Sequence, residues 1–404
     1  MTDREILLRI VEEKKDEYKR MRRLFHRIPE LGMEENETTE EICRILNAYA
    51  IRPQRLAPTG VVAYIGEEKN CTIALRADID GLSVTEETGL SFASVHPGKM
   101  HACGHDGHIA GLLGAAAVLK EMEKALPVRV KLIFQPSEEN TQGASHILKQ
   151  GVLDDVDYIF GLHLFSDMKR GEISVEPGPR MAQTDRFSVT FKGKGGHAGK
   201  PHQCVDAVVM AAEFVLSAQS IVSREIDPAQ GAVVTIGSFH GGSQYNVIAQ
   251  EAVAEGTCRS LQEDVARRLQ EAVERRAKHI AAGYGGEAFV EYHYGAHPPV
   301  INDAHFSRAV CAEAEKLLDR KFVHIPPLML GEDFSWYQKR IPGVFAFVGC
   351  GKEKGCSYPN HHPCFDLDED ALIDAVCLHL AAVFAVGEHR KHKEKMQSPG
   401  KDTR

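Results

Sequence analysis

Residues 101–108 combine several side chains that bind metal ions. They read His-Ala-Cys-Gly-His-Asp-Gly-His, so a thiol and an imidazole, Cys103 and His105, stand two positions apart. Gly104 between them lets the backbone turn so that both side chains can point the same way. Because thiolate and imidazole are ligands that zinc and similar divalent cations prefer, this segment predicts a metal site.

Three places further along the chain hold side chains that would complete a centre for two metal ions. They are Glu138 with Glu139, His163, and His361 with His362. Paired metal ions activate water and polarise carbonyl groups. The whole set therefore predicts a metal-dependent hydrolase.

Each of these residues also has a simpler interpretation. A lone thiol is often a small core residue, and a histidine after an apolar strand, such as His163, is often one too. Glu138 and Glu139 could be a solvated acidic loop in a chain with 57 acidic residues. The neighbouring histidines favour the metal role for Cys103, and the position directly after an apolar run favours a site role for the two glutamates.

The composition limits the class of protein. A chain of 404 residues with 43% hydrophobic side chains can bury more than one core, so we expect two domains. The net charge of -9 disfavours a nucleic-acid partner. Ten cysteines without dense spacing predict thiols in a reducing compartment. Residues 1–9 mix charges and the apolar stretch 111–119 is too short to span a bilayer, so we expect a cytoplasmic protein without a membrane partner.

The first part of the chain has the pattern of an α/β domain. A helical spacing covers residues 5–28, and apolar runs typical of buried strands follow at 61–65, 73–77, 130–134 and 158–162. Helices between such strands predict a largely parallel sheet with helices on both faces, whose ligands gather at the carboxyl ends of the strands. The candidate residues Glu138, Glu139 and His163 follow strands in this way, as do Asp78 and Asp80.

A second module begins after the Pro-Gly-Pro-Arg segment near residue 180. Its predicted order is strand, helix, strand, strand, helix, strand, which indicates a ferredoxin-like α+β fold. We therefore expect a catalytic domain of residues 1–182 and 298–390 with a lid domain inserted at 183–297. The polar tail 391–404 is expected to be disordered.

The motifs, taken together and in order, resemble the zinc peptidase family of aminoacylases and glutamate carboxypeptidases. The branch they resemble is that of hippurate hydrolases and auxin-conjugate amidohydrolases, and the resemblance covers nearly the whole chain. Its marks are Leu-Arg-Ala-Asp-Ile-Asp-Gly-Leu at 75–82, the segment 101–108, Gln-Pro-Ser-Glu-Glu at 135–139, Gly-Leu-His at 161–163, Gly-Gly-His-Ala-Gly-Lys-Pro-His at 195–202, Tyr-Asn-Val-Ile at 245–248, Gly-Glu-Asp-Phe at 331–334 and His-His-Pro at 361–363.

The resemblance implies a role for each candidate of the centre. It implies that Cys103 bridges two metal ions and that Glu138 is the general base. It implies that the other metal ligands are His105, Glu139, His163 and His361. His361 is preferred to His362 because the first residue of the His-x-Pro string is the ligand in the family. Zinc, manganese, cobalt and nickel all suit such a mixed set of ligands.

For the lid, the resemblance implies that His197 reaches the catalytic cleft and stabilises the oxyanion, although an ordinary loop histidine is the alternative. Asn246 and Arg259 are candidates for holding a substrate carboxylate. Members of this family often pair through the lid, so a homodimer is expected.

Six polar residues stay undecided between a role at the site and a local one. Asp78 and Asp80 could orient ligands or cap turns. Asp106 and His108 could support the metal site, and Asp106 could instead be a helix N-cap. Glu332 and Asp333, which precede Phe334, are explained equally by helix capping and by substrate contact.

The predicted reaction is hydrolysis of the amide bond of N-acyl amino acids, small molecules that yield a free amino acid and a carboxylic acid. One alternative is a dipeptidase, a carboxypeptidase or an N-acetyl-diaminopimelate deacetylase of the same fold. A non-catalytic metal-binding regulatory protein is the other. It is disfavoured because a binding module does not need a base such as Glu138 beside its metal.

Overall fold

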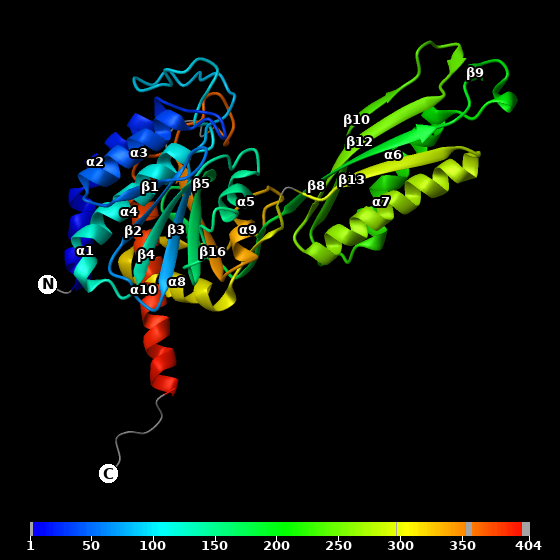
Figure 1. Ribbon diagram of the computed structural model, residues 1–404. Coiled ribbons are helices and arrows are strands. Elements are labelled where there is room, and N and C mark those ends of the chain that lie inside the picture. The colour runs from blue at the N-terminus through cyan, green and yellow to red at the C-terminus, as the bar shows by residue number, and fades with distance from the viewer. Residues whose placement is uncertain (1–2, 296, 353–357, 398–404) are drawn as a thin grey trace. The chain divides into compact units, whose positions relative to one another are not determined.

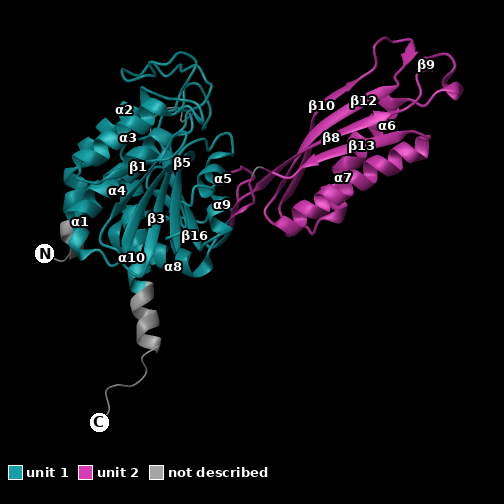
Figure 2. Cartoon of the chain, in the orientation of Figure 1, with its two compact units in different colours: residues 1–178, 301–326, 333–404 teal, residues 179–300, 327–332 magenta. Residues whose placement is uncertain are grey.

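The computed structural model describes residues 3–295, 297–352 and 358–397. The chain divides into two compact units (Figure 2). Unit 1 comprises residues 1–178, 301–326 and 333–404, and unit 2 comprises residues 179–300 and 327–332. The α/β architecture with an inserted second module is thus confirmed. The positions at which the chain passes from one unit to the other lie a few residues from the predicted domain boundaries. The assignment of residues 327–332 to unit 2 was not predicted.

Unit 1 is built on an eight-stranded mixed sheet with the strand order β1-β2-β4-β3-β5-β16-β6-β15 (Figure 1). The strands are β1 Pro53–Arg55, β2 Val61–Ile65, β3 Thr72–Asp78, β4 Arg129–Gln135, β5 Tyr158–Lys169, β6 Glu172–Ser174, β15 Lys321–Phe322 and β16 Gly343–Gly351. The central strands β4, β3, β5 and β16 are parallel, whereas β1, β2 and β4 pair antiparallel, as do β16 and β6. The prediction of a largely parallel sheet is therefore confirmed, because β6 and the edge strand β15 are also parallel and the antiparallel pairs are limited to β1–β2, β2–β4 and β16–β6.

The central strands β3 and β16 are buried along their whole length and β4 and β5 along most of theirs, as their continuous apolar runs predict. The helices of unit 1 are α1 Asp3–Glu13, α2 Lys15–His26, α3 Asn36–Ala48, α4 His105–Glu121, α5 Gly143–Leu148, α8 Ala304–Leu317, α9 Ser335–Gln338 and α10 Ala371–Gln397, with a 3-10 turn η1 at Glu123–Ala125. Helices α4, α8 and α10 pack together over the main core, and Phe334, next to α9, packs on Phe345 of β16.

The position of α4 depends on its small residues. A Cβ at Gly107 would lie 2.6 Å from Leu164 of β5, and one at Gly114 would lie 2.8 Å from the ring of Tyr18 in α2. Only glycine permits such close packing on two sides. The first residues of α4 are therefore held against the sheet, and one of them is the candidate ligand His105.

Two predicted elements differ from the structure. Residues 5–28 form two helices, α1 and α2, because Lys14 leaves the helical conformation at φ -96° and ψ 2°. Helix α10 continues through Gln397, so the first part of the tail predicted to be disordered is helical. Residues 398–404 lie outside the described residues.

Unit 2 has the predicted ferredoxin-like fold. Its four-stranded antiparallel sheet has the order β10-β12-β8-β13, with the first and third strands of the module at its centre. Its elements are β8 Gln183–Lys192, β9 Gly196–His197, η2 Pro201–Gln203, α6 Ala207–Glu225, β10 Ala232–Gly241, β11 Val247–Ile248, β12 Glu251–Ser260, α7 Glu263–Tyr284 and β13 Glu287–His293. Phe187, Val189 and Phe191 alternate along β8 and form the core beneath α6 and α7. The short strands β7 Gly178–Met181 and β14 Val300–Asn302 lie where the chain crosses between the units.

Two helices of the described chain are long and apolar enough to span a bilayer, judged by length and composition alone. They are α6 and the first part of α10, residues 371–388. The stretch in α10 is longer than the apolar run 111–119 considered above, and most of it is buried in unit 1. The cytoplasmic location stays a prediction.

Candidate metal centre

Unit 1 brings the five predicted metal ligands into one cluster at the carboxyl ends of its parallel strands. In each of two sets, all the donor atoms lie within 4.8 Å of one another. One set is Cys103, His105 and His163, and the other is Cys103, Glu139 and His361. Because parallel strands end at the same edge of a sheet, the loops after them converge there although their sequence positions differ by more than 250 residues.

Cys103 belongs to both sets. Its Sγ lies 3.3 Å from Nε2 of His163 and 3.2 Å from Nε2 of His361. Burial raises the pKa of this thiol well above its usual range, and the charges of Glu139 and Glu138 raise it further. A thiolate is therefore stable here only next to positive charge, which a divalent cation would supply.

Backbone carbonyls orient two of the imidazoles. Nδ1 of His105 donates to the carbonyl of Asp80 at 2.9 Å, and Nδ1 of His163 donates to the carbonyl of Leu164 at 3.0 Å. With the proton on Nδ1, each ring turns the Nε2 lone pair toward the cluster. In the described part of the chain, Nε2 of His105 is buried and has no hydrogen-bond partner.

The potential at His105 favours positive charge. Burial alone would lower the pKa of His105, but Asp78, Asp80 and Glu139 raise it to about 10. His163 differs, because burial and the neighbouring His108 hold its pKa well below the usual range. A bound cation would satisfy both residues, since it needs neutral imidazoles and supplies the charge that the carboxylates attract.

Glu139 links the two sets. Its Oε1 lies 3.9 Å from Nε2 of His105 and 3.4 Å from Nε2 of His361. This oxygen has no hydrogen-bond partner among the described residues. Burial would raise the pKa of Glu139, but His361, His105 and Cys103 lower it, so the group is ionised. Sulfur, nitrogen and oxygen atoms that face one another, with the buried His105 Nε2 and Glu139 Oε1 left without hydrogen-bond partners, are what a site for divalent cations requires.

Glu138 lies beside this cluster. It is buried, and a carboxylate oxygen lies within 4.8 Å of the donor atoms of His105 and Glu139. The chain turns sharply here, because Ser137 has φ 55° and the carbonyl of Glu138 accepts a hydrogen bond from Thr141 N at 2.6 Å. This turn directs two consecutive glutamates to one site.

Sequence reasoning missed Glu35, which holds the same turn. The carboxyl group of Glu35 is fully buried and accepts hydrogen bonds from Ser137 N at 2.8 Å and from the Thr59 hydroxyl at 2.5 Å. Burial raises its pKa to about 7 despite these donors, and the charge of Asp80 adds to the effect. No sequence signal distinguishes this glutamate from its neighbours at residues 34–41.

The undecided residues Asp78 and His108 lie beside the cluster, since their donor atoms and one of His105 are all within 4.8 Å of one another. Nδ1 of His108 lies 2.5 Å from Asp78, and its Nε2 accepts from Leu164 N at 2.9 Å. Both ring nitrogens are thus used. Burial would raise the pKa of Asp78, but His105, Arg76 and His108 hold it well below its usual range.

Asp80 and Asp106 also have defined partners. Asp80 accepts from Glu139 N at 3.0 Å, so it positions this candidate ligand as well as His105. Asp106 is not the N-cap of α4, because Gly104 occupies that position with φ 86°. Its buried carboxylate instead pairs with Arg22 at 2.7 Å and with His26 at 2.8 Å.

Asp333 joins a buried network, which goes beyond helix capping. It accepts from Arg76 at 3.1 Å, from the Gln135 amide at 2.8 Å and from Ala144 N at 2.9 Å. Arg76 also donates to Asp78 at 2.7 Å. The network therefore ties the ends of β3 and β4 to one another.

The choice of His361 over His362 agrees with the geometry. Nδ1 of His362 accepts from Cys364 N at 3.0 Å, and its ring stacks on Tyr358 with centroids 4.4 Å apart. His362 is absent from the groups of metal-binding side chains found among the described residues.

The three predicted substrate-binding residues lie in unit 2, at two separate places. His197 of β9 pairs with Val247 of β11, and Ala198 N donates to the carbonyl of Asn246, so these two residues are neighbours at one tip of the unit (Figure 1). Nδ1 of His197 accepts from Gly199 N at 3.0 Å, which leaves the proton on the exposed Nε2. Arg259 lies at the opposite end of β12, roughly 26 Å along the strand from Glu251 at about 3.3 Å per residue.

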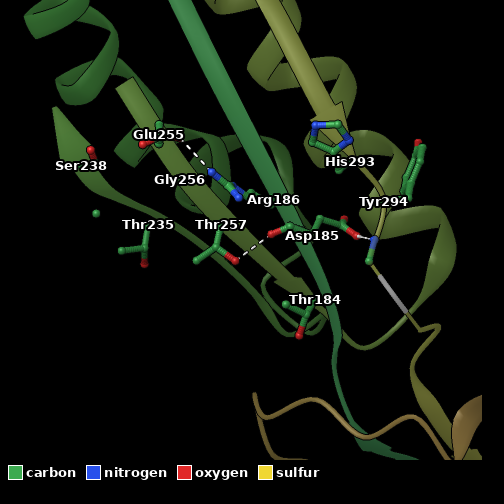
Figure 3. A pocket seen from close by; sticks show the side chains of 12 residues that line it. Thr184, Asp185, Arg186, Thr235, Ser238, Glu255, Gly256, Thr257, His293 and Tyr294 are labelled. Carbon is green, nitrogen blue, oxygen red and sulfur yellow. Dashed lines mark hydrogen bonds and ion pairs between the residues drawn. The ribbon is translucent and has the colours of Figure 1, made fainter. Parts of the chain in front are cut away.

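Unit 2 also has a hollow of about 720 Å³ over its sheet (Figure 3). Its polar side chains include Thr235, Thr257 and an ion pair of Arg186 with Glu255 at 2.9 Å. At the edge of the hollow, the buried Asp185 of β8 accepts a hydrogen bond from Gly295 N at 2.7 Å. This bond joins β8, where the chain enters unit 2, to the segment after β13, where it leaves. Of the described residues, His197, Asn246 and Arg259 do not line this hollow.

Comparison with known proteins gives consistent matches over nearly the whole chain. Residues 74–385 match the model of peptidase family M20/M25/M40. An N-acetyl-L-cysteine deacetylase of Bacillus subtilis (strain 168) is 42% identical over 358 residues, covering 88% of this chain and 84% of the relative. An N-acetyldiaminopimelate deacetylase of Streptococcus thermophilus (strain CNRZ 1066) is 39% identical over 365 residues, covering 88% and 95%.

Among solved structures, the chain is similar to a Bacillus subtilis protein described as a dinuclear metal binding peptidase of the M20 family. The TM-score is 0.83 and the sequence identity is 37%, and the match covers 93% of this chain and 99% of that one.

Replacing Glu35 by glutamine should change how stability depends on pH. A carboxyl group with a folded pKa of about 7 and an ordinary pKa of 4.5 binds more protons in the folded state. The free energy of unfolding should therefore fall as the pH rises between these values, by up to about 3 kcal/mol. Glutamine can accept from Ser137 N through its oxygen and donate from its amide nitrogen to the Thr59 hydroxyl oxygen, so both contacts can form without a charge.

The measurement is urea denaturation from pH 5 to pH 8 with a chelator present, because bound cations add a pH dependence of their own. The Glu35→Gln variant should lose less stability than the wild type as the pH rises. Parallel curves for the two proteins would show that Glu35 does not titrate in this range.

Proposed function

We propose a specific reaction for this chain, which belongs to peptidase family M20/M25/M40 and is a metal-dependent amidohydrolase acting on linear amides. The reaction is hydrolysis of N-acyl amino acids to a free amino acid and a carboxylic acid. The observation that carries the proposal is the convergence of two donor sets on Cys103, with Glu138 beside them. The relatives support the substrate class, because N-acetylcysteine and N-acetyldiaminopimelate both carry an acyl group on an amino-acid nitrogen.

In this proposal Cys103 would contribute to the binding of both divalent cations, and the remaining ligands would be His105, Glu139, His163 and His361. When bound, such cations lower the pKa of a coordinated water and polarise the substrate carbonyl. Sulfur, nitrogen and oxygen ligands in one set are compatible with zinc, manganese, cobalt or nickel.

Glu138 is the proposed general base. Its carboxylate takes a proton from the attacking water and later delivers it to the leaving nitrogen, so that an amine departs rather than an amide anion. Its position favours this role, because the buried carboxylate lies within 4.8 Å of donor atoms of His105 and Glu139, which would hold the cations.

The residues of unit 2 are proposed to bind substrate. His197 has its proton on Nε2, so it can donate to a developing oxyanion. Asn246 lies beside it and offers an amide. Arg259 donates to Thr257 and to the carbonyl of Cys258 through one nitrogen, Nη1, and its guanidinium is suited to a substrate carboxylate.

A second candidate is favoured by one relative. The N-acetyldiaminopimelate deacetylase is matched over 95% of its length. Its substrate is itself an N-acyl amino acid with a second amino acid head group, so the two candidates differ in side-chain recognition and share the chemistry. A dipeptidase or carboxypeptidase would instead accept a peptide in the same centre.

Replacing Glu138 by glutamine should separate catalysis from metal binding. The variant should retain its metal content and lose about 10²- to 10⁴-fold in kcat, because glutamine cannot accept the proton. Cys103→Ala should lose metal and activity together, and Cys311→Ala, on α8 away from the centre, serves as the control. Metal content is measured by atomic absorption alongside turnover. Normal turnover of Glu138→Gln would remove the base assignment.

A substrate panel tests the reaction. The enzyme is assayed with added Mn²⁺, Co²⁺ or Zn²⁺ on N-acetyl-L-cysteine, N-acetyldiaminopimelate, N-benzoylglycine and a dipeptide, and the free amine is detected with ninhydrin. We expect release from the N-acyl amino acids and little from the dipeptide. A preference for the dipeptide would favour the peptidase alternative, and no release from any substrate would contradict the proposal.

We also propose that unit 2 pairs with a second copy. Helix α6 leaves Val209 44% exposed and Leu216 75% exposed, although apolar side chains of this size are usually covered. Leu216→Glu should shift the protein from dimer to monomer in sedimentation velocity without lowering the stability of the fold. A wild type that sediments as a monomer at micromolar concentration would contradict this pairing.

A further inference from the structure

Asn360 immediately precedes the candidate ligand His361 and contacts two other segments of the centre. Its side-chain Nδ2 donates to the carbonyl of Cys103 at 3.1 Å and to the carbonyl of Leu164 at 3.2 Å. The Oδ1 of the same amide lies 3.2 Å from the hydroxyl of Ser166. One half-buried amide therefore joins the loop before α4, the strand β5 and the loop after β16.

The strand β5 is shaped to receive this amide. Gly349 of β16 pairs with Phe165, but the next pair of the ladder is Gly351 with Lys169, so β5 has extra residues at this point. Ser166 lies in this irregular stretch, and its N–H is directed to Oδ1 of Asn360 at 3.4 Å. A regular ladder would have used this N–H within the sheet.

Only an asparagine side chain suits these partners at this distance from the backbone. The carbonyls of Cys103 and Leu164 accept hydrogen bonds and cannot donate, so an amino group must face them. The N–H and O–H of Ser166 lie on the other side of the amide and require an acceptor. An aspartate would place an oxygen against both carbonyls, and an alanine would remove all four of these hydrogen bonds.

The contacts of Asn360 reach three candidate ligands. The carbonyl of Leu164 also accepts Nδ1–H of His163, so Asn360 and His163 share one acceptor. The carbonyl of Cys103 belongs to the shared thiol residue itself. His361 follows directly, in a left-handed conformation with φ 72° that costs free energy for a residue with a Cβ.

His361 depends on such support more than the other ligands do. Its side chain is 54% exposed, whereas those of His105 and Cys103 are buried, and its backbone is held by one hydrogen bond from His361 N to the carbonyl of Ala102 at 2.7 Å. Packing alone does not hold an exposed ring 3.2 Å from a thiol.

We propose that Asn360 is a positioning residue of the metal centre, which sets His361 against Cys103 and His163. This inference depends on the proposed function, because it takes these three residues to be metal ligands. Groups that orient metal ligands typically change affinity by about 10- to 100-fold when they are removed.

The test is Asn360→Ala, with His362→Ala as a matched control in the same loop. Water can replace the amide at this half-exposed place, so we expect the variant to fold. Binding of Co²⁺ is titrated against a chelating dye, and the thiolate-to-cobalt absorption is recorded. We expect one of the two equivalents of Co²⁺ to bind about 10- to 100-fold more weakly with an altered spectrum. In turnover, kcat should fall more than KM rises.

The outcomes separate the two proposals. If the wild type binds no Co²⁺ or shows no thiolate absorption, the proposed metal centre itself fails. If the wild type binds two equivalents and Asn360→Ala binds both with equal affinity and an unchanged spectrum, the positioning role fails. An effect of His362→Ala as large as that of Asn360→Ala would show a general loosening of the loop and would also overturn it.

Should Asn360→Ala not fold, Ser166→Ala provides the second variant. It removes one donor to Oδ1 and keeps the amide in place, so we expect a weakening of about 3-fold in the same equivalent of Co²⁺. Unchanged affinity and spectrum in Ser166→Ala would then contradict the proposal.

Discussion

At one end of the sheet of unit 1, buried acidic groups repel one another, and the arrangement of the site depends on how this repulsion is balanced. Glu138, Glu139, Asp78 and the thiol of Cys103 lie close together and largely out of water. Burying carboxylates together costs free energy unless positive charge lies among them. Arg76 supplies part of this charge to Asp78. Beside Cys103, the unpartnered Oε1 of Glu139 and Nε2 of His105 favour divalent cations as the source of the remaining positive charge.

This constraint explains how the surrounding residues are used. The imidazoles of His105 and His163 are oriented by backbone carbonyls, which fix the position of the proton without adding negative charge. The turn that presents Glu138 is held by Glu35, whose raised pKa places its own ionisation near neutrality. Rigid support of this kind keeps donor atoms aimed at one another before any cation binds.

The two units contribute different kinds of surface. Except for the exposed His361, unit 1 largely buries its candidate residues at the ends of parallel strands, which are covered on both faces. Unit 2 has an antiparallel sheet with helices on one face, so its other face and its loops remain accessible. The exposed His197, at the end of the short strand β9, and Asn246, in the loop before β11, lie in this connecting region, which is where binding residues are expected when a rigid scaffold positions them.

The sequence by itself determined the family, the α/β class and the ferredoxin-like module, because apolar periodicity and ordered motifs are local properties of the chain. It also indicated which residues could bind metal. Only the tertiary structure decided how they are arranged. Asp106 pairs with Arg22 and does not cap α4, and a single hydrogen bond to Cys364 N turns His362 away. Glu35 and Asn360 carried no local signal, since their importance comes from partners about 100 to 260 residues away that only folding brings near.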